Sequence, residues 1–201
     1  ILDFKENNGP AFSKWKFIEY IQNNLDKYSV NDICIIVDGD DYLLENALNI
    51  INDTYINNKC WCTFGETSSK ANFISQHTER AKSNNNYCDI RISSFFSNHP
   101  RTFKIELIKF LKENIFKYNG KWLLKGTDFT LLSDIFELCG NEKISYINKN
   151  IYYYRIHKNN SFINGNEKNL IEFKKKNIEC IRNHEKKNKF IEDIHIVMCC
   201  W

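Results

Sequence analysis

Three carboxylates surround one glycine at the end of an apolar run, and they are the residues of this chain best suited to chemistry. Asp38, Asp40 and Asp41 directly follow Ile33-Cys34-Ile35-Ile36-Val37. Carboxylates this close repel one another unless a cation or several hydrogen-bond donors neutralise them. Hard oxygen ligands favour Mg²⁺ or Mn²⁺. The segment therefore indicates a site for a divalent ion and for phosphate.

The apolar run predicts where these carboxylates lie in the fold. Residues 33–37 are apolar or Cys, mostly β-branched, and too few for a helix, so we expect a strand that is buried on both faces. Strands of this kind belong to α/β sheets, in which ligands bind beyond the carboxyl ends of the strands. Gly39 allows the chain to turn tightly at that edge.

The acidic segment has two plainer interpretations, a calcium-binding loop and a helix cap. An EF-hand loop would need an oxygen ligand where Tyr42 stands and a helix, not a strand, before it, so the pattern argues against one. A helix cap stays open, with Asp40 or Asp41 as the N-cap of a helix over 44–55, where apolar residues recur at helical spacing. Such a cap is compatible with metal binding.

Composition narrows the class of protein. With 201 residues, 42% of them hydrophobic, the chain can form one domain with a real core. Its 28 basic and 25 acidic residues are too balanced to predict binding to nucleic acid or to a membrane surface. Eight cysteines without a Cys-x-x-Cys pair argue against a zinc ribbon and favour reduced thiols in the cytoplasm. No stretch reaches the length of a membrane span.

The first half of the chain alternates helical and strand patterns. A helix is expected after Pro10, a strand at 33–37, a helix at 44–55 and a strand at 60–64, which predicts a parallel sheet. Residues 66–100 have no clear periodicity and predict a long loop.

The second half has a similar pattern up to a charged tail. We expect a helix beyond Phe103, a helix over 128–139 that Gly140 ends, and short strands at 144–147 and 151–154. The lysine-rich tail after these strands predicts a solvated helical surface.

Five segments, in order within residues 7–161, resemble family 2 glycosyltransferases of the GT-A fold. They are Asn8-Gly9 followed by Lys14, the D-x-D-D sequence Asp38-Gly39-Asp40-Asp41, the H-x-R-T-F sequence His99-Pro100-Arg101-Thr102-Phe103, Gly126-Thr127-Asp128 at an acidic-pair position, and the Y-x-Y-x-x-H sequence within 151–157. Thr127 departs from the family pattern, which has an acid there. D-x-D alone is a weak signal, whereas several segments in the family's order are a stronger one.

The resemblance implies an α/β, GT-A-like (Rossmann-like) fold, with a mostly parallel sheet flanked by helices. It implies an N-terminally truncated domain, because no strand and base-binding loop precede Ile1. The expected division is a partial glycosyltransferase domain at 1–160, a charged helical linker at 161–192, and a possible first strand of a following, tandem domain at 193–201.

The implied reaction moves a sugar from a nucleotide-diphosphate sugar, most simply a UDP-sugar, to an acceptor hydroxyl on a glycan, protein or lipid-linked sugar. Inversion at the anomeric carbon is carried by the resemblance alone. Asp38, Asp40 and His157 are the implied ligands of Mn²⁺ or Mg²⁺, and Asp128 is the implied general base. The residues implied to contact the donor are Asp38, Asp41, Lys14 and Arg101.

Structural roles remain alternatives for several of these residues. Lys14 and Arg101 could be ordinary surface charges, Asp128 the N-cap of the helix over 128–139, and His157 a hydrogen-bonded loop histidine. A noncatalytic domain that binds a sugar or nucleotide is a second functional hypothesis, favoured by the missing first strand and by Thr127. A nucleic-acid-binding module is a third, but basic and aromatic residues are not interleaved on one platform.

Overall fold

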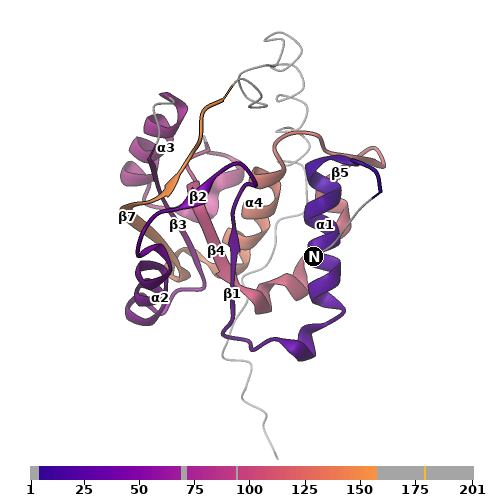
Figure 1. The fold of residues 1–201 in the computed structure, drawn as a ribbon, viewed down its shortest axis with the longest axis horizontal. Coiled ribbons are helices and arrows are strands. Elements are labelled where there is room, and N and C mark those ends of the chain that lie inside the picture. Colours follow the sequence, from indigo (N-terminus) through magenta and orange to yellow (C-terminus); the bar gives the residue numbers. More distant parts are fainter. Residues whose placement is uncertain (1–4, 69–71, 94, 158–178, 180–201) are drawn as a thin grey trace, which may run out of the picture.

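The computed structural model describes residues 5–68, 72–93, 95–157 and 179, and they form a five-stranded sheet with helices on both faces (Figure 1). The strand order is β1-β4-β3-β7-β2. The strands are β1 (Ile33–Ile36), β2 (Tyr42–Leu43), β3 (Cys62–Ser68), β4 (Asn98–Lys104) and β7 (Ile144–Tyr153), with β5 (Lys117–Tyr118) and β6 (Lys121–Trp122) forming a separate pair.

Within the described ranges up to residue 157, four α-helices and several short 3₁₀ helices surround the sheet. The α-helices are α1 (Gly9–Gln22), α2 (Ala47–Asn58), α3 (Asn72–Ser83) and α4 (Thr127–Cys139). The 3₁₀ helices are Leu25–Lys27, Tyr87–Arg91, Ile105–Phe110, Glu113–Phe116 and Asn141–Lys143. Among the described residues, no helix combines the length and the apolar character that crossing a membrane requires.

The sheet is mixed, so the α/β class is confirmed but the expected mostly parallel sheet is wrong. β4 pairs antiparallel with both β1 and β3, β2 pairs antiparallel with β7, and only β3 and β7 pair in parallel. The sequence hides β4 because Pro100 and buried polar residues such as Asn98 and Thr102 interrupt any apolar run. β1, β3 and β7 nevertheless run in the same direction, since β4 is antiparallel to both of its neighbours.

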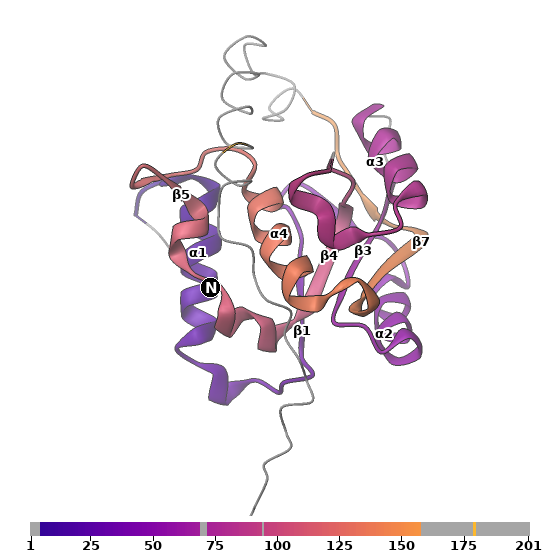
Figure 2. The same cartoon turned by 180° about the vertical axis from the view of Figure 1, so that it is seen from behind.

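Alternate residues of the strands serve two hydrophobic cores, one on each face of the sheet. Cys34 and Phe103 pack into the larger core, which α1 and α4 cover, whereas Ile33 and Ile35 pack against the smaller core below α2. Figure 2 shows α4 in front of the sheet, on the face that carries the larger core. α4 is buried along almost its whole length, which explains why the sequence pattern located it well.

Several expected boundaries move. The helix expected at 44–55 is α2, three residues later, and the second strand extends to Ser68. The expected loop at 66–100 contains α3 and the start of β4, and the expected helix near Phe103 is the end of β4 followed by a 3₁₀ helix. The two short strands expected after residue 143 form the single strand β7. The linker expected at 161–192 and the strand expected at 193–201 lie outside the described residues, apart from residue 179.

Candidate functional site

The acidic loop lies where the end of β1 meets the first half of β4 and the end of β7. Ile36 pairs with Arg101, and Tyr42, just beyond the loop, pairs with Tyr153. The N–H of Asp41 donates to the carbonyl oxygen of Asp38 at 3.0 Å, which closes the turn. Residues from distant parts of the sequence therefore meet at one edge of the sheet, at the carboxyl ends of β1, β3 and β7.

Tyr152, a residue of β7, holds the acidic loop in place. The sequence did not reveal this role. Its buried hydroxyl accepts the N–H of Asp38 at 3.0 Å and donates to Oδ2 of Asp41 at 2.9 Å. The backbone N–H of Arg155 donates to Oδ1 of the same carboxylate, also at 2.9 Å. Both oxygens of Asp41 are thus engaged in shaping the loop. Burial raises the pKa of the Tyr152 phenol, so the hydroxyl keeps its proton and remains a donor.

Asp40 and His157 form a close pair on the outer side of this loop. Asp40 Oδ2 lies 2.7 Å from His157 Nε2, and the hydrogen bond from the imidazole lowers the pKa of the Asp40 carboxyl. Burial, followed by repulsion from the Asp128 carboxylate, raises the pKa of Asp38 instead. The two carboxylates of the D-x-D sequence therefore lie in electrostatically different environments, one that lowers the pKa of Asp40 and one that raises the pKa of Asp38.

The fit of a divalent ion rests on Asp40 and His157. Magnesium is usually held by one or two protein carboxylates together with substrate phosphates, at ligand distances of about 2.0–2.1 Å. Two neighbouring ligands of an octahedral ion lie roughly 3 Å apart at such distances, so the 2.7 Å pair needs to open only slightly. Across the described ranges, no three His, Cys, Asp or Glu side chains are grouped closely enough to hold a metal. Asp38 Oδ2 faces His99 Nε2 at 3.5 Å, so the predicted set of three ligands is not preassembled.

Lys14, Arg101 and Asp128 form an ion-pair cluster beside the acidic loop. Lys14 on α1 places Nζ 3.0 Å from Asp128 Oδ1, and Arg101 on β4 places Nη1 2.7 Å from Asp128 Oδ2. Lys14 also donates to Oγ1 of Thr127 at 3.2 Å. Neither cation is a solitary surface charge, and Arg101 is buried.

Asp128 belongs to this cluster and is not a helix cap. α4 begins at Thr127 with Gly126 as its N-cap, and no side chain caps it. Burial acts to raise the pKa of Asp128, but the Arg101 guanidinium and the Lys14 ammonium outweigh burial and hold that pKa well below its usual range. The cap proposed for the acidic loop is also wrong, because Asn46 precedes α2.

His99 connects the cationic cluster to the acidic loop. Arg101 Nη1 lies 2.7 Å from His99 Nε2, which must accept because a guanidinium only donates. The other ring nitrogen, Nδ1, therefore carries the proton and faces the carbonyl oxygen of Ile36 at 3.3 Å. Burial, followed by the Arg101 charge, lowers the pKa of His99 to about 3. A neutral His99, stacked on Tyr152 with ring centroids 4.7 Å apart, thus orients Arg101.

The residues predicted to bind the metal and the donor, and the predicted base, lie together at this edge of the sheet. The motifs did not predict the contacts through Tyr152 and His99 that join them. Tyr152 and His99 lie within quoted segments, yet neither had an assigned role. One of three consecutive tyrosines faces inward, and alternation along a strand was the only available signal. No family model matches this chain, and the comparison with curated proteins found no match. The likeness to glycosyltransferases therefore rests on the motifs alone.

Proposed function

We propose that this chain is a metal-dependent glycosyltransferase domain that transfers a sugar from a nucleotide-diphosphate sugar to an acceptor hydroxyl. The observation that carries the proposal is the meeting of two unlike groups at one sheet edge. One is the Asp40–His157 pair, and the other is the Lys14–Arg101–Asp128 cluster. Carboxylates for a cation beside cations for phosphate suit a donor that carries a diphosphate.

In this proposal, Asp40 and His157 would hold the Mn²⁺ or Mg²⁺ ion. When bound, the ion supplies Lewis-acid neutralisation of the charge on the departing group. Lys14 and Arg101 provide protein cations for the phosphates of the donor, Lys14 from the more exposed position and Arg101 from within the buried cluster. Asp41 keeps the loop in shape through Tyr152 and through the Arg155 N–H.

Asp128 is the proposed general base that takes the proton of the acceptor hydroxyl. In the structure its carboxylate is neutralised by two cations, and its lowered pKa makes it a weak base. Donor phosphates would compete for Lys14 and Arg101, weaken both ion pairs and raise the pKa of Asp128. Donor binding would thereby activate the base. The acceptor proposed is a glycan, a protein or a lipid-linked sugar.

The double pairing of Asp128 also favours a second candidate function, a noncatalytic domain that binds the nucleotide-sugar. If the donor leaves both ion pairs intact, no base is available and the domain binds without turnover. A measurement of UDP release from UDP-sugars in the presence of Mn²⁺ separates the two candidates. Sustained release supports the transferase, and donor binding without release supports the noncatalytic domain.

The test of the proposed donor site is a thermal-shift titration with UDP, with Mn²⁺ and with EDTA. We expect a Mn²⁺-dependent rise in Tm, since a ligand that binds only the native state stabilises it by about 2.7 kcal/mol at a hundred times its Kd. Asp40→Ala should abolish the rise, whereas Glu45→Ala, which removes an exposed carboxylate close by, should keep it. No rise in the unmodified chain, or an equal rise with Asp40→Ala, would contradict the proposal.

A further inference from the structure

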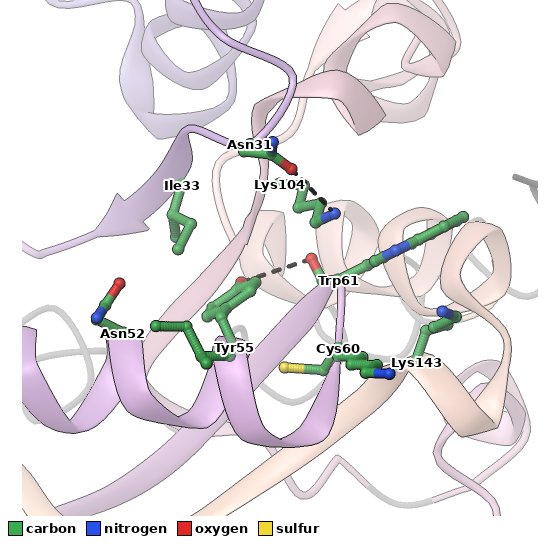
Figure 3. A pocket seen from close by; sticks show the side chains of 10 residues that line it. Asn31, Ile33, Asn52, Tyr55, Cys60, Trp61, Lys104 and Lys143 are labelled. Atoms are coloured by element: carbon green, nitrogen blue, oxygen red, sulfur yellow. Dashed lines mark hydrogen bonds between the residues drawn. The ribbon is translucent and has the colours of Figure 1, made fainter.

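A hollow of about 440 Å³ lies at the end of the sheet opposite the candidate site, between α2 and the starts of β1 and β3 (Figure 3). Ile33, which begins β1, lines it, whereas the acidic loop follows the other end of that strand. The side chains that line it are Asn31, Ile33, Asn52, Tyr55, Ile56, Lys59, Cys60, Trp61, Lys104 and Lys143.

The hollow is separate from the candidate site on β4 as well. Lys104 lies three residues after Arg101, so the two side chains leave opposite faces of the sheet. Arg101 faces α4 and Asp128, whereas Thr102, which shares the face of Lys104, contacts Tyr55 of α2. A ligand in this hollow would not touch the acidic loop.

Strand register builds a lysine–tryptophan–lysine row across this end of the sheet. The N–H of Trp61 donates to the carbonyl oxygen of Lys143, and the N–H of Lys104 donates to that of Trp61, both at 2.8 Å. Nζ lies 5.8 Å from the centroid of the Trp61 ring for Lys104 and 5.2 Å for Lys143. Figure 3 shows the indole extending between the two lysine side chains. Cation–π attraction to the indole favours these positions of the ammonium groups.

A third lysine and two amides complete the lining. Lys59 follows the last turn of α2 in a left-handed conformation, with φ of 49°, at the helix end whose dipole favours cations. Asn31 Oδ1 accepts from Lys104 Nζ at 3.5 Å, and Asn52 adds a second amide from α2. None of the lining residues is Asp or Glu. The hollow is therefore electropositive and has hydrogen-bonding groups beside its charges.

The groups at the floor of the hollow are suited to packing and not to reaction. Cys60 is buried, and burial raises the pKa of its thiol, so little reactive thiolate is present. Burial also raises the pKa of Tyr55, and its hydroxyl is 2.9 Å from Oγ1 of Thr102. The hollow is thus a place for binding.

We propose that this hollow binds a small organic polyanion, a molecule with two or more phosphate or carboxylate groups. The three lysines come from separate segments, and two of them flank the indole, so their charges are spread along the hollow. Each ammonium is a single point of charge, unlike the fork of an arginine, and spaced anionic groups match this arrangement better than one group does. The volume falls within the range of small-molecule pockets, about 300–1,000 Å³.

The test is an NMR titration of the ¹⁵N-labelled chain with tripolyphosphate, citrate and inorganic phosphate, at constant ionic strength and in buffer freed of metal ions beforehand on a chelating resin. The indole N–H of Trp61 reports locally on the hollow. We expect a saturable shift, with tripolyphosphate or citrate binding at least about tenfold more tightly than inorganic phosphate, because each charge-assisted hydrogen bond contributes that order of affinity. Preference for tripolyphosphate would assign a phosphorylated ligand, and preference for citrate a polycarboxylate.

Substitutions of Lys104 and Lys143 test whether these lysines cause the shift of the Trp61 indole signal. Lys104→Gln and Lys143→Gln should each weaken binding about tenfold, whereas Lys121→Gln, an exposed lysine on β6 with the same loss of charge, should leave it unchanged. Asp40→Ala should also leave it unchanged, which separates this inference from the proposed donor site. A shift of Trp61 that does not saturate, equal binding of inorganic phosphate, or equal weakening in Lys121→Gln would overturn the inference.

Discussion

The guanidinium of Arg101 lies 2.7 Å from the carboxylate of Asp128 and joins a central strand to the first turn of α4. The same nitrogen, Nη1, lies 2.7 Å from His99 Nε2, and Nη2 donates to the carbonyl oxygen of Ser97. Arg101 is therefore held in place from several sides, at the edge of the larger core. Burial is the largest influence on the pKa of His99 and of Asp128, and the Arg101 charge is the next, lowering the pKa of both groups. Arg101 is therefore the electrostatic link between the two.

Replacing Asp128 with Asn should separate donor binding from transfer. The amide keeps the shape of the side chain but cannot take a proton, and the loss of a general base lowers rates by about 10²- to 10⁴-fold. Under the proposed function, Mn²⁺-dependent UDP binding should persist while UDP release from a UDP-sugar falls by that factor. Asp53→Asn, on the exposed side of α2, is the matched control. Unchanged release in Asp128→Asn would exclude Asp128 as the base.

The acidic loop and the α/β class could be predicted because their signals are local. An apolar strand leads directly into Asp38, and the helix over 128–139 has many apolar residues and ends at Gly140. β4 could not be predicted, because its buried polar residues are satisfied by partners far away in the sequence. Thr102, for example, contacts Thr63 and Tyr55. The expectation of a mostly parallel sheet was therefore wrong.

The contacts within the site were hidden for a similar reason. Lys14 sits on a helix whose inward face the sequence left ambiguous, and only the packing of α1 near α4 turns it toward Asp128. Tyr152 is one of three consecutive tyrosines, and its burial depends on the position of β7 between β3 and β2. Residue types indicated the chemistry of the site, whereas tertiary packing decides which neighbouring side chains orient its charged groups.

Tyr152→Phe should loosen the acidic loop and destabilise the fold. The change leaves the N–H of Asp38 without its acceptor and Asp41 without one donor, and such losses at partly buried groups cost about 1–3 kcal/mol. Urea unfolding should report this decrease, and the Kd of UDP with Mn²⁺ should rise. Tyr153→Phe, which alters the exposed tyrosine stacked on Tyr42, should change neither quantity. Equal effects of the two substitutions would refute the anchoring role of Tyr152.

Arg91→Met should destabilise the chain by breaking buried ion pairs that are not part of the candidate site. Arg91 is buried between Asp134 and Glu137 of α4, with Nε 2.6 Å from Glu137 Oε1. Removing the cation leaves two buried carboxylates without the charge that neutralises them, and such changes cost about 3–5 kcal/mol. The measurement is the free energy of unfolding in urea, compared with Arg80→Met on the exposed side of α3. A loss no greater than that of the control would show that the buried ion pairs add little stability.

Mild acid should destabilise the protein through two histidines, the buried His99 and the half-buried His77. Burial lowers the pKa of His99 to about 3 and that of His77 to about 4, whereas both have pKa values near 6.5 when unfolded. Between these values the unfolded chain binds protons that the native state does not, so the stability present above pH 6.5 is lost as the pH falls. The slope approaches about 1.4 kcal/mol per pH unit for each histidine.

Measuring the free energy of unfolding between pH 6 and pH 4.5 tests this linkage before most carboxylates titrate. His99→Gln keeps a group that can accept from Arg101 but removes one titration, so its stability should depend on pH about half as steeply as that of the unmodified chain. The quantity to compare is the slope of the unfolding free energy against pH, and not the absolute stability, since the substitution also perturbs packing against Tyr152. An unchanged slope would mean that His99 is protonated in the native state, and the neutral tautomer that orients Arg101 would have to be abandoned.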